Sequence, residues 1–328
     1  MLKLVIQTEL ELTMKILNLF NISPENKQRL KSLDGVELIN LDDLKAYDYN
    51  QIDFVYGWNQ RGDELLKKLT HVKFVQSISA GVDYLPLNEF KQRHILLANT
   101  SGIHAAPISE TVVAYLLAFS RGIIWSDQFK EDHLWESDKL RKSVFSLSGQ
   151  RALVYGTGNI GTAIAIHLHQ LGLQVSGVNL HHHIIPEFDE ILPFQPTIPS
   201  NKKFDYIINT MPLTSKTYHF FDDKFFSSLS NQPMFINVGR GASVDTSALI
   251  TALTHCLLKS AAIDVFEEEP LPNDSPLWQL NNVLITPHIS GASADYELQA
   301  FDIFWQNLNS FINTGHVSVN KVDLVRGY

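Results

Sequence analysis

The sequence of 328 residues has little cysteine, no excess of positive charge and no long apolar run. Its single cysteine, Cys256, leaves no partner for a disulfide within the chain, which fits a reducing compartment and a cytoplasmic location. Cys256 belongs to an apolar, helix-like stretch, so we expect it to fill the core rather than to act as a nucleophile. The net charge of −9 argues against nucleic acid or an acidic membrane surface as a partner.

The sequence also lacks the features of a membrane span or a secretion signal. The longest apolar stretch, Val112 to Trp125, contains polar residues and is too short to cross a bilayer. The first twelve residues carry Glu9 and Glu11 and have no basic start, so we expect no signal peptide. Met14 begins a strand pattern, and we interpret the residues before it as an extension or an early start codon.

Short apolar stretches alternate with helical patterns along the chain, which is typical of parallel sheets with helices on both faces. The length suits two domains of about 150 residues each. We expect strands at residues 15–19, 36–40, 54–57, 74–77, 95–98, 152–155, 174–178, 204–209, 234–238, 261–265 and 283–286. We expect helices at residues 25–33, 63–69, 107–125, 160–171, 246–258 and 290–313, with a helical connection over 126–148. The helix after Pro107 is apolar enough to be either a core helix or an oligomer face.

A glycine-rich turn opens the second group of strands. Gly156, Gly158 and Gly161 form G-x-G-x-x-G between a strand and a helix, the context in which this motif binds a dinucleotide. Gly156 allows the tight turn, Gly158 admits a pyrophosphate and Gly161 lets the helix pack closely. Asn159 and Ile160 begin the helix, whose free N–H groups attract phosphate. The alternative is a glycine-rich surface turn.

Three later strand ends carry residues suited to chemistry. Arg240 stands between two glycines, where its planar side chain is available to an anion or a polarised carbonyl. Residues 264–269 include four carboxylates, most of them typical of a solvated loop, and one of them is a candidate partner for a histidine. His288 follows a strand and a proline, a place for a general acid or base. Taken singly, Arg240 also suits a surface salt bridge and His288 a structural role.

Together these residues describe one reaction. Arg240 would bind and polarise a 2-oxo acid, and His288 would donate a proton to its carbonyl oxygen as hydride arrives. A carboxylate would keep His288 protonated, and in the reverse direction His288 would take the proton of a hydroxyl group.

Seven motifs in this order resemble the D-isomer-specific 2-hydroxyacid dehydrogenase family over nearly the whole chain beyond about residue 15. In chain order they are residues 79–83, residues 99–110, the glycine turn at 156–161, and residues 212–214, 237–241, 264–270 and 286–291. The resemblance implies an α/β fold of two Rossmann-like, doubly wound parallel sheets. A cofactor domain of residues 100–290 would be inserted into a flavodoxin-like substrate domain of residues 1–99 and 291–328. Members are commonly homodimers, with the helix after Pro107 and the connection behind it in the interface.

The resemblance implies Arg240, Glu269 and His288 as the catalytic set, with Glu269 chosen because it precedes the proline. Backbone amides near Ala80, Gly81 and Val82 would hold the substrate carboxylate. Ser79, Arg240 and His288 complete the implied substrate contacts, and Asp264 would contact the nicotinamide carboxamide. Further implied cofactor contacts lie at Asn179, Leu180, His181, Pro212, Thr217, Val238, Gly239 and Gly291, together with Arg240 and His288.

Cofactor choice is predicted from the end of the second strand of the cofactor domain. Members that prefer NAD carry a carboxylate there, whereas this chain has Asn179, followed by Leu180 and His181 to His183. No negative charge would repel a 2′-phosphate, so the sequence favours NADP over NAD. The histidines would assist in mildly acidic solution, although they also suit a solvated loop or, less well, a metal site; no metal is assigned.

For the substrate we expect a small 2-oxo acid such as glyoxylate, hydroxypyruvate or an aliphatic 2-ketoacid, because no basic cluster near Ser79 to Asp83 indicates a phosphate pocket. The alternatives are a non-enzymatic NAD(P)-binding sensor or scaffold of the same fold and a methyltransferase that binds S-adenosylmethionine. A methyltransferase would have no use for Arg240 and His288.

Overall fold

The computed structural model describes residues 13–328, which fold into two compact α/β units. The first unit contains the described residues up to Ile103 together with Ala294–Tyr328, and the second contains His104–Ser293. Residues 1–12, nearly all of the extension expected before Met14, lie outside the described part. The domain boundaries expected from the sequence differ from this division by a few residues. Residues 100–103 remain in the first unit, where the carbonyl of Ser101 accepts a hydrogen bond from Asn320 Nδ2.

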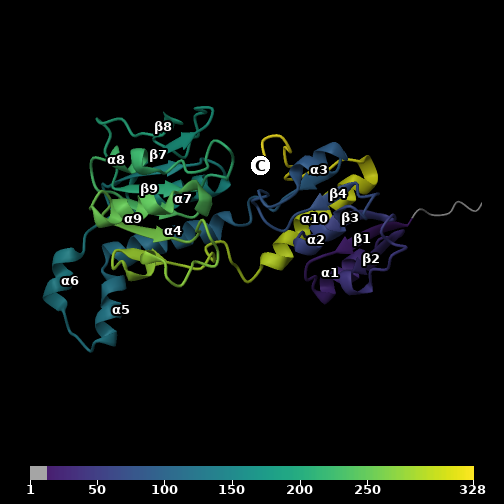
Figure 1. The fold of residues 1–328 in the computed structure, drawn as a ribbon, viewed down its shortest axis with the longest axis horizontal. Helices are drawn as coiled ribbons and strands as arrows, with labels where there is room; N and C mark the ends of the chain where they lie inside the picture. The colour runs from purple at the N-terminus through teal and green to yellow at the C-terminus, as the bar shows by residue number, and fades with distance from the viewer. Residues whose placement is uncertain (1–12) are drawn as a thin grey trace, which may run out of the picture. The chain divides into compact units, whose positions relative to one another are not determined.

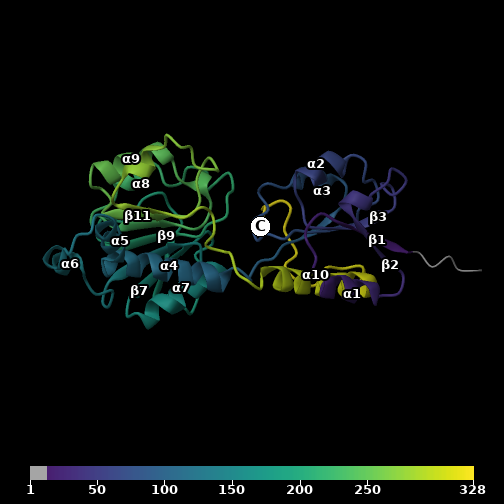
Figure 2. The same ribbon diagram turned by 90° about the horizontal axis from the view of Figure 1, so that it is seen from below.

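The first unit contains a five-stranded parallel sheet in the order β2-β1-β3-β4-β5. This is the flavodoxin-like order 2-1-3-4-5, which confirms the predicted fold. Helices α2 (Gln60–Leu66) and α3 (Leu87–Gln92) lie on one face, and α1 (Pro24–Lys31) and α10 (Tyr296–Thr314) lie on the other (Figures 1 and 2). The strands are β1 (Met14–Asn18), β2 (Val36–Asn40), β3 (Ile52–Tyr56), β4 (Phe74–Gln76) and β5 (Leu96–Ala98).

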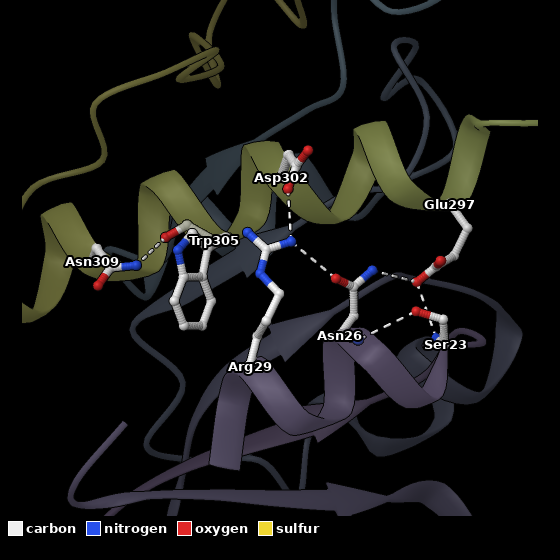
Figure 3. Close-up of polar contacts among 7 residues, drawn as sticks. All are labelled: Ser23, Asn26, Arg29, Glu297, Asp302, Trp305 and Asn309. Atoms are coloured by element: carbon white, nitrogen blue, oxygen red, sulfur yellow. Dashed lines mark hydrogen bonds and ion pairs between the residues drawn. The ribbon is translucent and has the colours of Figure 1, made fainter. Parts of the chain in front are cut away.

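A set of polar contacts joins α1 to the C-terminal helix α10 (Figure 3). Glu297 Oε1 accepts a hydrogen bond from the amide of the fully buried Asn26 at 3.0 Å. Arg29 Nη1 donates to Asp302 Oδ1 at 2.7 Å, and the guanidinium lies 4.9 Å from the centre of the Trp305 ring. These contacts satisfy the buried amide and hold the end of the chain against the beginning of the same unit.

The second unit contains seven parallel strands in the order β12-β11-β10-β9-β6-β7-β8. If β6 to β11 are numbered 1 to 6, they follow the Rossmann order 3-2-1-4-5-6, which confirms the predicted Rossmann-like fold. Strand β12 adds a seventh strand at one edge. Helices α4 (Ala105–Ser120) and α7 (Asn159–Gln170) cover one face, and α8 (Asp223–Ser227) and α9 (Thr246–Thr254) cover the other (Figure 2). The strands are β6 (Arg151–Tyr155), β7 (Gln174–Asn179), β8 (Glu190–Pro193), β9 (Tyr206–Asn209), β10 (Met234–Asn237), β11 (Ser260–Ile263) and β12 (Val283–Ile285).

The apolar helix α4 is a core helix of the second unit. Its Val112 and Leu116 side chains are fully buried in the cluster that also contains residues of α7 and the sheet. The helix ends at Ser120, where Gly122 with a φ of 70° turns the chain into α5 (Ile123–Glu131), and α6 (Ser137–Ser143) follows. In the described part no single helix is long and apolar enough to cross a membrane, whereas the pair α4 and α5, bent by 65°, reaches that length and composition together.

Two expectations from the sequence were wrong, and one strand was not expected. The helix expected over 246–258 ends at Thr254, and Cys256 lies beyond it as an exposed residue with a φ of 58° rather than as part of the core. The helix expected from residue 290 begins at Tyr296, because the preceding loop is held by side chains of the second unit. Strand β8 was not predicted, since its residues lack a clear apolar pattern: three are partly buried and Pro193 is exposed.

Candidate active site

Arg240, Asp264 and His288 follow three neighbouring strands of the second unit, β10, β11 and β12. Carboxyl ends of parallel strands meet at one edge of a sheet, where open α/β folds bind their ligands. The loops after these strands touch one another directly. Asp264 N donates to Asn237 O at 3.0 Å, and His288 N donates to Asp264 O at 2.8 Å. The structure therefore brings the three predicted loops together.

The two glycines around Arg240 let neighbouring loops approach its backbone. A Cβ atom on Gly241 would lie 1.8 Å from the carbonyl oxygen of Phe266, and one on Gly239 would lie 2.8 Å from that of Met211. Arg240 is half-buried, and its Nη1 donates to Gly239 O at 2.9 Å. The guanidinium is thus folded back along its own loop at the carboxyl edge of the sheet.

His288 and Glu269 form a hydrogen-bonded pair. The distance between His288 Nδ1 and Glu269 Oε2 is 2.7 Å, and the second carboxylate oxygen accepts a hydrogen bond from Phe266 N at 2.8 Å. A carboxylate only accepts hydrogen bonds, so Nδ1 carries the hydrogen and Nε2 is the ring atom left to exchange a proton. The His288 side chain is 54% exposed, which gives a ligand access to it.

The neighbouring glutamates have other surroundings. Glu267 accepts a hydrogen bond from Thr246 N at 2.7 Å and pairs with His219 Nε2 at 2.5 Å. Burial acts to raise the pKa of Glu267, but the hydrogen bonds from Thr246 and His219 outweigh it and leave the pKa below its ordinary value. Glu268 is exposed. Within this acidic run, Glu269 is the glutamate that the structure places on His288.

Asp264 is fully buried, and both its carboxylate oxygens serve the loop that carries His288. Oδ1 accepts hydrogen bonds from Thr286 Oγ1 at 2.5 Å and from Ile289 N at 3.0 Å. Oδ2 accepts one from Ser290 N at 3.0 Å. Asp264 therefore fixes residues on both sides of His288, a role that the sequence did not indicate.

The glycine turn fits the pyrophosphate of a dinucleotide. A Cβ on Gly158 would meet no atom within 4 Å, so the space above this residue is open. A Cβ on Gly161 would lie 1.9 Å from Gly156 O, which shows how closely the start of α7 packs on the turn. Gly156 has a φ of 95°, and the residue that precedes α7 is Gly158, which has no side chain to cap the helix. The turn thus combines close packing at Gly161 with open space at Gly158, which suits the approach of an anion.

The end of β7 is organised by Asn179. Its Nδ2 donates to Thr157 Oγ1 at 3.1 Å and to His183 O at 2.8 Å, and its Oδ1 accepts from His183 N at 2.9 Å. The exposed rings of His181 and His183 lie 5.6 Å apart, and His182 Nε2 contacts a carbonyl of β8 at 2.8 Å. Among residues 13–328, no three His, Cys, Asp or Glu side chains are arranged to hold a metal ion.

The remaining predicted cofactor residues lie on the same edge of this unit. Thr217 Oγ1 donates to Pro212 O at 2.7 Å and so closes the loop after β9. Val238, directly after β10, is buried, and Leu180 is exposed at the end of β7. The carbonyl of Gly291 contacts His104 Nδ1 at 3.1 Å.

The predicted substrate loop, Ser79–Val82, belongs to the first unit. The Ala80 carbonyl accepts a hydrogen bond from Asn99 Nδ2 at 2.7 Å, and the Gly81 carbonyl accepts one from Ser79 Oγ at 2.8 Å. Within the described chain, the amides of Ala80, Gly81 and Val82 have no hydrogen-bond acceptor. Fixed carbonyls and available amides are the arrangement that a carboxylate needs.

Comparison with known proteins identifies the family. The model of the NAD binding domain of D-isomer specific 2-hydroxyacid dehydrogenases matches residues 113–290, more than half of the chain. The chain belongs to the D-isomer-specific 2-hydroxyacid dehydrogenase family. As a member of this family it is an NAD(P)-dependent oxidoreductase that transfers hydride between the cofactor and 2-oxo or 2-hydroxy acids, which confirms the family and reaction predicted from the sequence.

Among its relatives, a glyoxylate reductase of Thermococcus litoralis is 30% identical over 270 residues, which cover 79% of this chain and 80% of that protein. A phosphoglycerate dehydrogenase of Lactobacillus plantarum is 40% identical, with a TM-score of 0.56 over 94% of this chain and 100% of the other. An NADPH-dependent glyoxylate/hydroxypyruvate reductase of Sinorhizobium meliloti, solved with NADP and sulfate, is 25% identical with a TM-score of 0.78. That match covers 96% of this chain and 100% of the other.

Sequence reasoning missed three polar residues around the dehydrogenase loops. Thr286 is the first residue of the motif at 286–291, but only the structure shows its hydrogen bond to Asp264. His219 pairs with Glu267 across 48 positions of sequence, and Tyr115 contacts Thr286 across 171. Such long-range contacts leave no local pattern that would have revealed them.

Proposed function

We propose that this dehydrogenase reduces a small 2-oxo acid, such as glyoxylate or hydroxypyruvate, with NADPH. The observation that carries the proposal is the pair of His288 and Glu269, 2.7 Å apart at the edge of the sheet where the loop of Arg240 also lies. The glyoxylate reductase of Thermococcus litoralis and the glyoxylate/hydroxypyruvate reductase of Sinorhizobium meliloti support the choice of substrate.

The proposed roles follow from the chemistry of the side chains. The planar guanidinium of Arg240 binds the carboxylate or carbonyl of the 2-oxo acid and polarises the carbonyl. His288 donates the proton on Nε2 to the carbonyl oxygen, while Glu269 holds Nδ1 and favours the charged ring. The amides of Ala80 to Val82 hold the substrate carboxylate. When bound, the nicotinamide supplies the hydride.

For the cofactor, we propose that the turn at Gly156, Gly158 and Gly161 binds the pyrophosphate and that the end of β7 binds the adenosine ribose. Asn179 brings no negative charge to that end, which supports NADP, the cofactor found in the Sinorhizobium meliloti structure. We further propose that Asp264 borders the nicotinamide, that the enzyme is cytoplasmic, as its single cysteine suggests, and that it is a homodimer.

The deciding experiment is a panel of 2-oxo acids assayed with NADPH and with NADH. We expect the highest kcat/KM for glyoxylate or hydroxypyruvate, with NADPH favoured over NADH. A strong preference for NADH would contradict the cofactor assignment. Binding of NAD(P)H without turnover of any 2-oxo acid would contradict the reductase and favour a sensor or scaffold.

A further inference from the structure

The buried helix α4 sends one hydroxyl group into the loop that carries His288. Tyr115, which is only 3% exposed, makes a short hydrogen bond through its hydroxyl to Thr286 Oγ1. Burial raises the pKa of Tyr115 to about 12, so the phenol keeps its hydrogen at neutral pH. A tyrosine on the buried face of α4 is thus connected to the candidate active site.

The direction of these hydrogen bonds follows from the groups involved. Thr286 Oγ1 donates its only hydrogen to Asp264 Oδ1 at 2.5 Å. The Thr286 oxygen therefore accepts from Tyr115, and the three residues form an ordered chain from the helix to the carboxylate. Asp264 in turn accepts the N–H groups of Ile289 and Ser290, which directly follow His288.

One further hydrogen bond joins the same loop to α4, between His104 Nδ1 at the start of the helix and Gly291 O at 3.1 Å. Thr111 Oγ1 also lies 3.4 Å from Ser290 O, but its single hydrogen goes to Pro107 O at 2.9 Å. Burial lowers the pKa of His104, and the nearby charge of Arg240 acts in the same direction. The buried helix α4 is therefore joined to the loop by hydrogen bonds at Tyr115 and at His104.

We propose that Tyr115 is a positioning residue for His288 in the proton-transfer step. It acts through Thr286 and Asp264 and touches neither cofactor nor substrate. The inference rests on the proposed reductase function, in which His288 must meet the substrate oxygen at hydrogen-bond distance. Small errors in such a position are costly, because proton transfer depends steeply on the distance between donor and acceptor.

The test is Tyr115→Phe, which removes the hydroxyl and keeps the ring. Tyr206→Phe is the matched control, because Tyr206 is also buried and makes a single hydrogen bond, to Gln150 Oε1 at 2.5 Å, from β9. We expect Tyr115→Phe to lower kcat about tenfold, to increase the solvent deuterium isotope effect and to leave the KM for the cofactor within about twofold. Tyr206→Phe should leave all three unchanged.

A second pair of variants tests the path through Thr286. Thr286→Val removes the hydroxyl that joins Tyr115 to Asp264, and it should lower kcat at least as much as Tyr115→Phe. Thr286→Ser keeps the hydroxyl and should restore most of the rate. Adding Tyr115→Phe to Thr286→Val should cost little more, because both substitutions break the same chain.

The ring signals of His288 in ¹³C-histidine-labelled protein provide a readout that needs no turnover. Their pH titration should change in Tyr115→Phe but not in Tyr206→Phe. If the wild-type protein reduces no 2-oxo acid, the proposed function fails while this titration still tests the positioning role. The proposal is overturned if Tyr115→Phe leaves kcat and the His288 titration as in wild type, or if Tyr206→Phe alters them equally.

Discussion

At the scale of single residues, three consecutive glutamates have three different surroundings. Glu267 pairs with His219, Glu268 faces solvent and Glu269 contacts His288. Their chemistry is identical, so composition and spacing alone could not distinguish them. The resemblance to the family selected Glu269 as the residue before the proline, and the structure places that same residue 2.7 Å from the histidine ring.

Glu269→Gln should slow reduction. The amide keeps the shape of the side chain but replaces the charged acceptor of the His288 Nδ1 hydrogen bond by a neutral and weaker one. At neutral pH we expect kcat/KM to drop by at least about tenfold. The measurement is kcat/KM for the 2-oxo acid at one neutral pH.

Glu268→Gln is the matched control, because it removes the same charge one residue away without touching His288. Its kcat/KM should match that of the wild type. An equal loss in both variants would show that the general charge of the loop, and not the contact with His288, supports the reaction.

At the scale of elements, the glycine turn combines two different requirements. Gly161 lies against Gly156, whereas Gly158 borders open space. The motif predicts the close packing of Gly161, and the open space at Gly158 is consistent with the cofactor contact proposed there. What the motif could not indicate is that Thr210, from the loop after β9, also fastens the turn by donating to Gly156 O at 3.0 Å.

Gly158→Ala and Gly161→Ala should therefore fail in different ways. The new methyl group at position 158 meets no protein atom, so the melting temperature should stay near that of wild type while the Kd for NADPH rises about tenfold or more. The methyl group at position 161 would lie 1.9 Å from Gly156 O, so this variant should unfold at a clearly lower temperature. Thermal unfolding and cofactor titration of both proteins separate the two effects.

At the scale of the whole molecule, the sequence predicts the strand order better than the ends of elements. The resemblance to the family implies a flavodoxin-like and a Rossmann-like sheet, and both orders are found, with the edge strand β8 as the one strand that was not expected among the described residues. Cys256 and the start of α10 were placed wrongly, because they depend on tertiary contacts. The apolar run around Cys256 turns after Thr254, and the Ser290 amide is taken by Asp264 before any helix begins.

Two copies of the chain are expected to associate through an exposed segment of the second unit. Trp135 is 94% exposed and Leu134 is 50% exposed, on the segment between α5 and α6, which extends from the second unit (Figure 1). Large apolar side chains exposed together mark an interaction site, which fits the proposed homodimer. Light scattering coupled to gel filtration should give a dimer for the wild type at micromolar concentration.

Trp135→Glu should shift this equilibrium toward the monomer while the fold, followed by circular dichroism, is retained. Tyr47→Glu provides the control, because Tyr47 is a 62% exposed aromatic residue of the first unit and its substitution adds the same charge. A wild-type monomer would contradict the homodimer, and a Trp135→Glu protein that remains dimeric would remove this segment from the interface. A loss of dimer in Tyr47→Glu alone would instead place the contact on the first unit, because the charge would then act there.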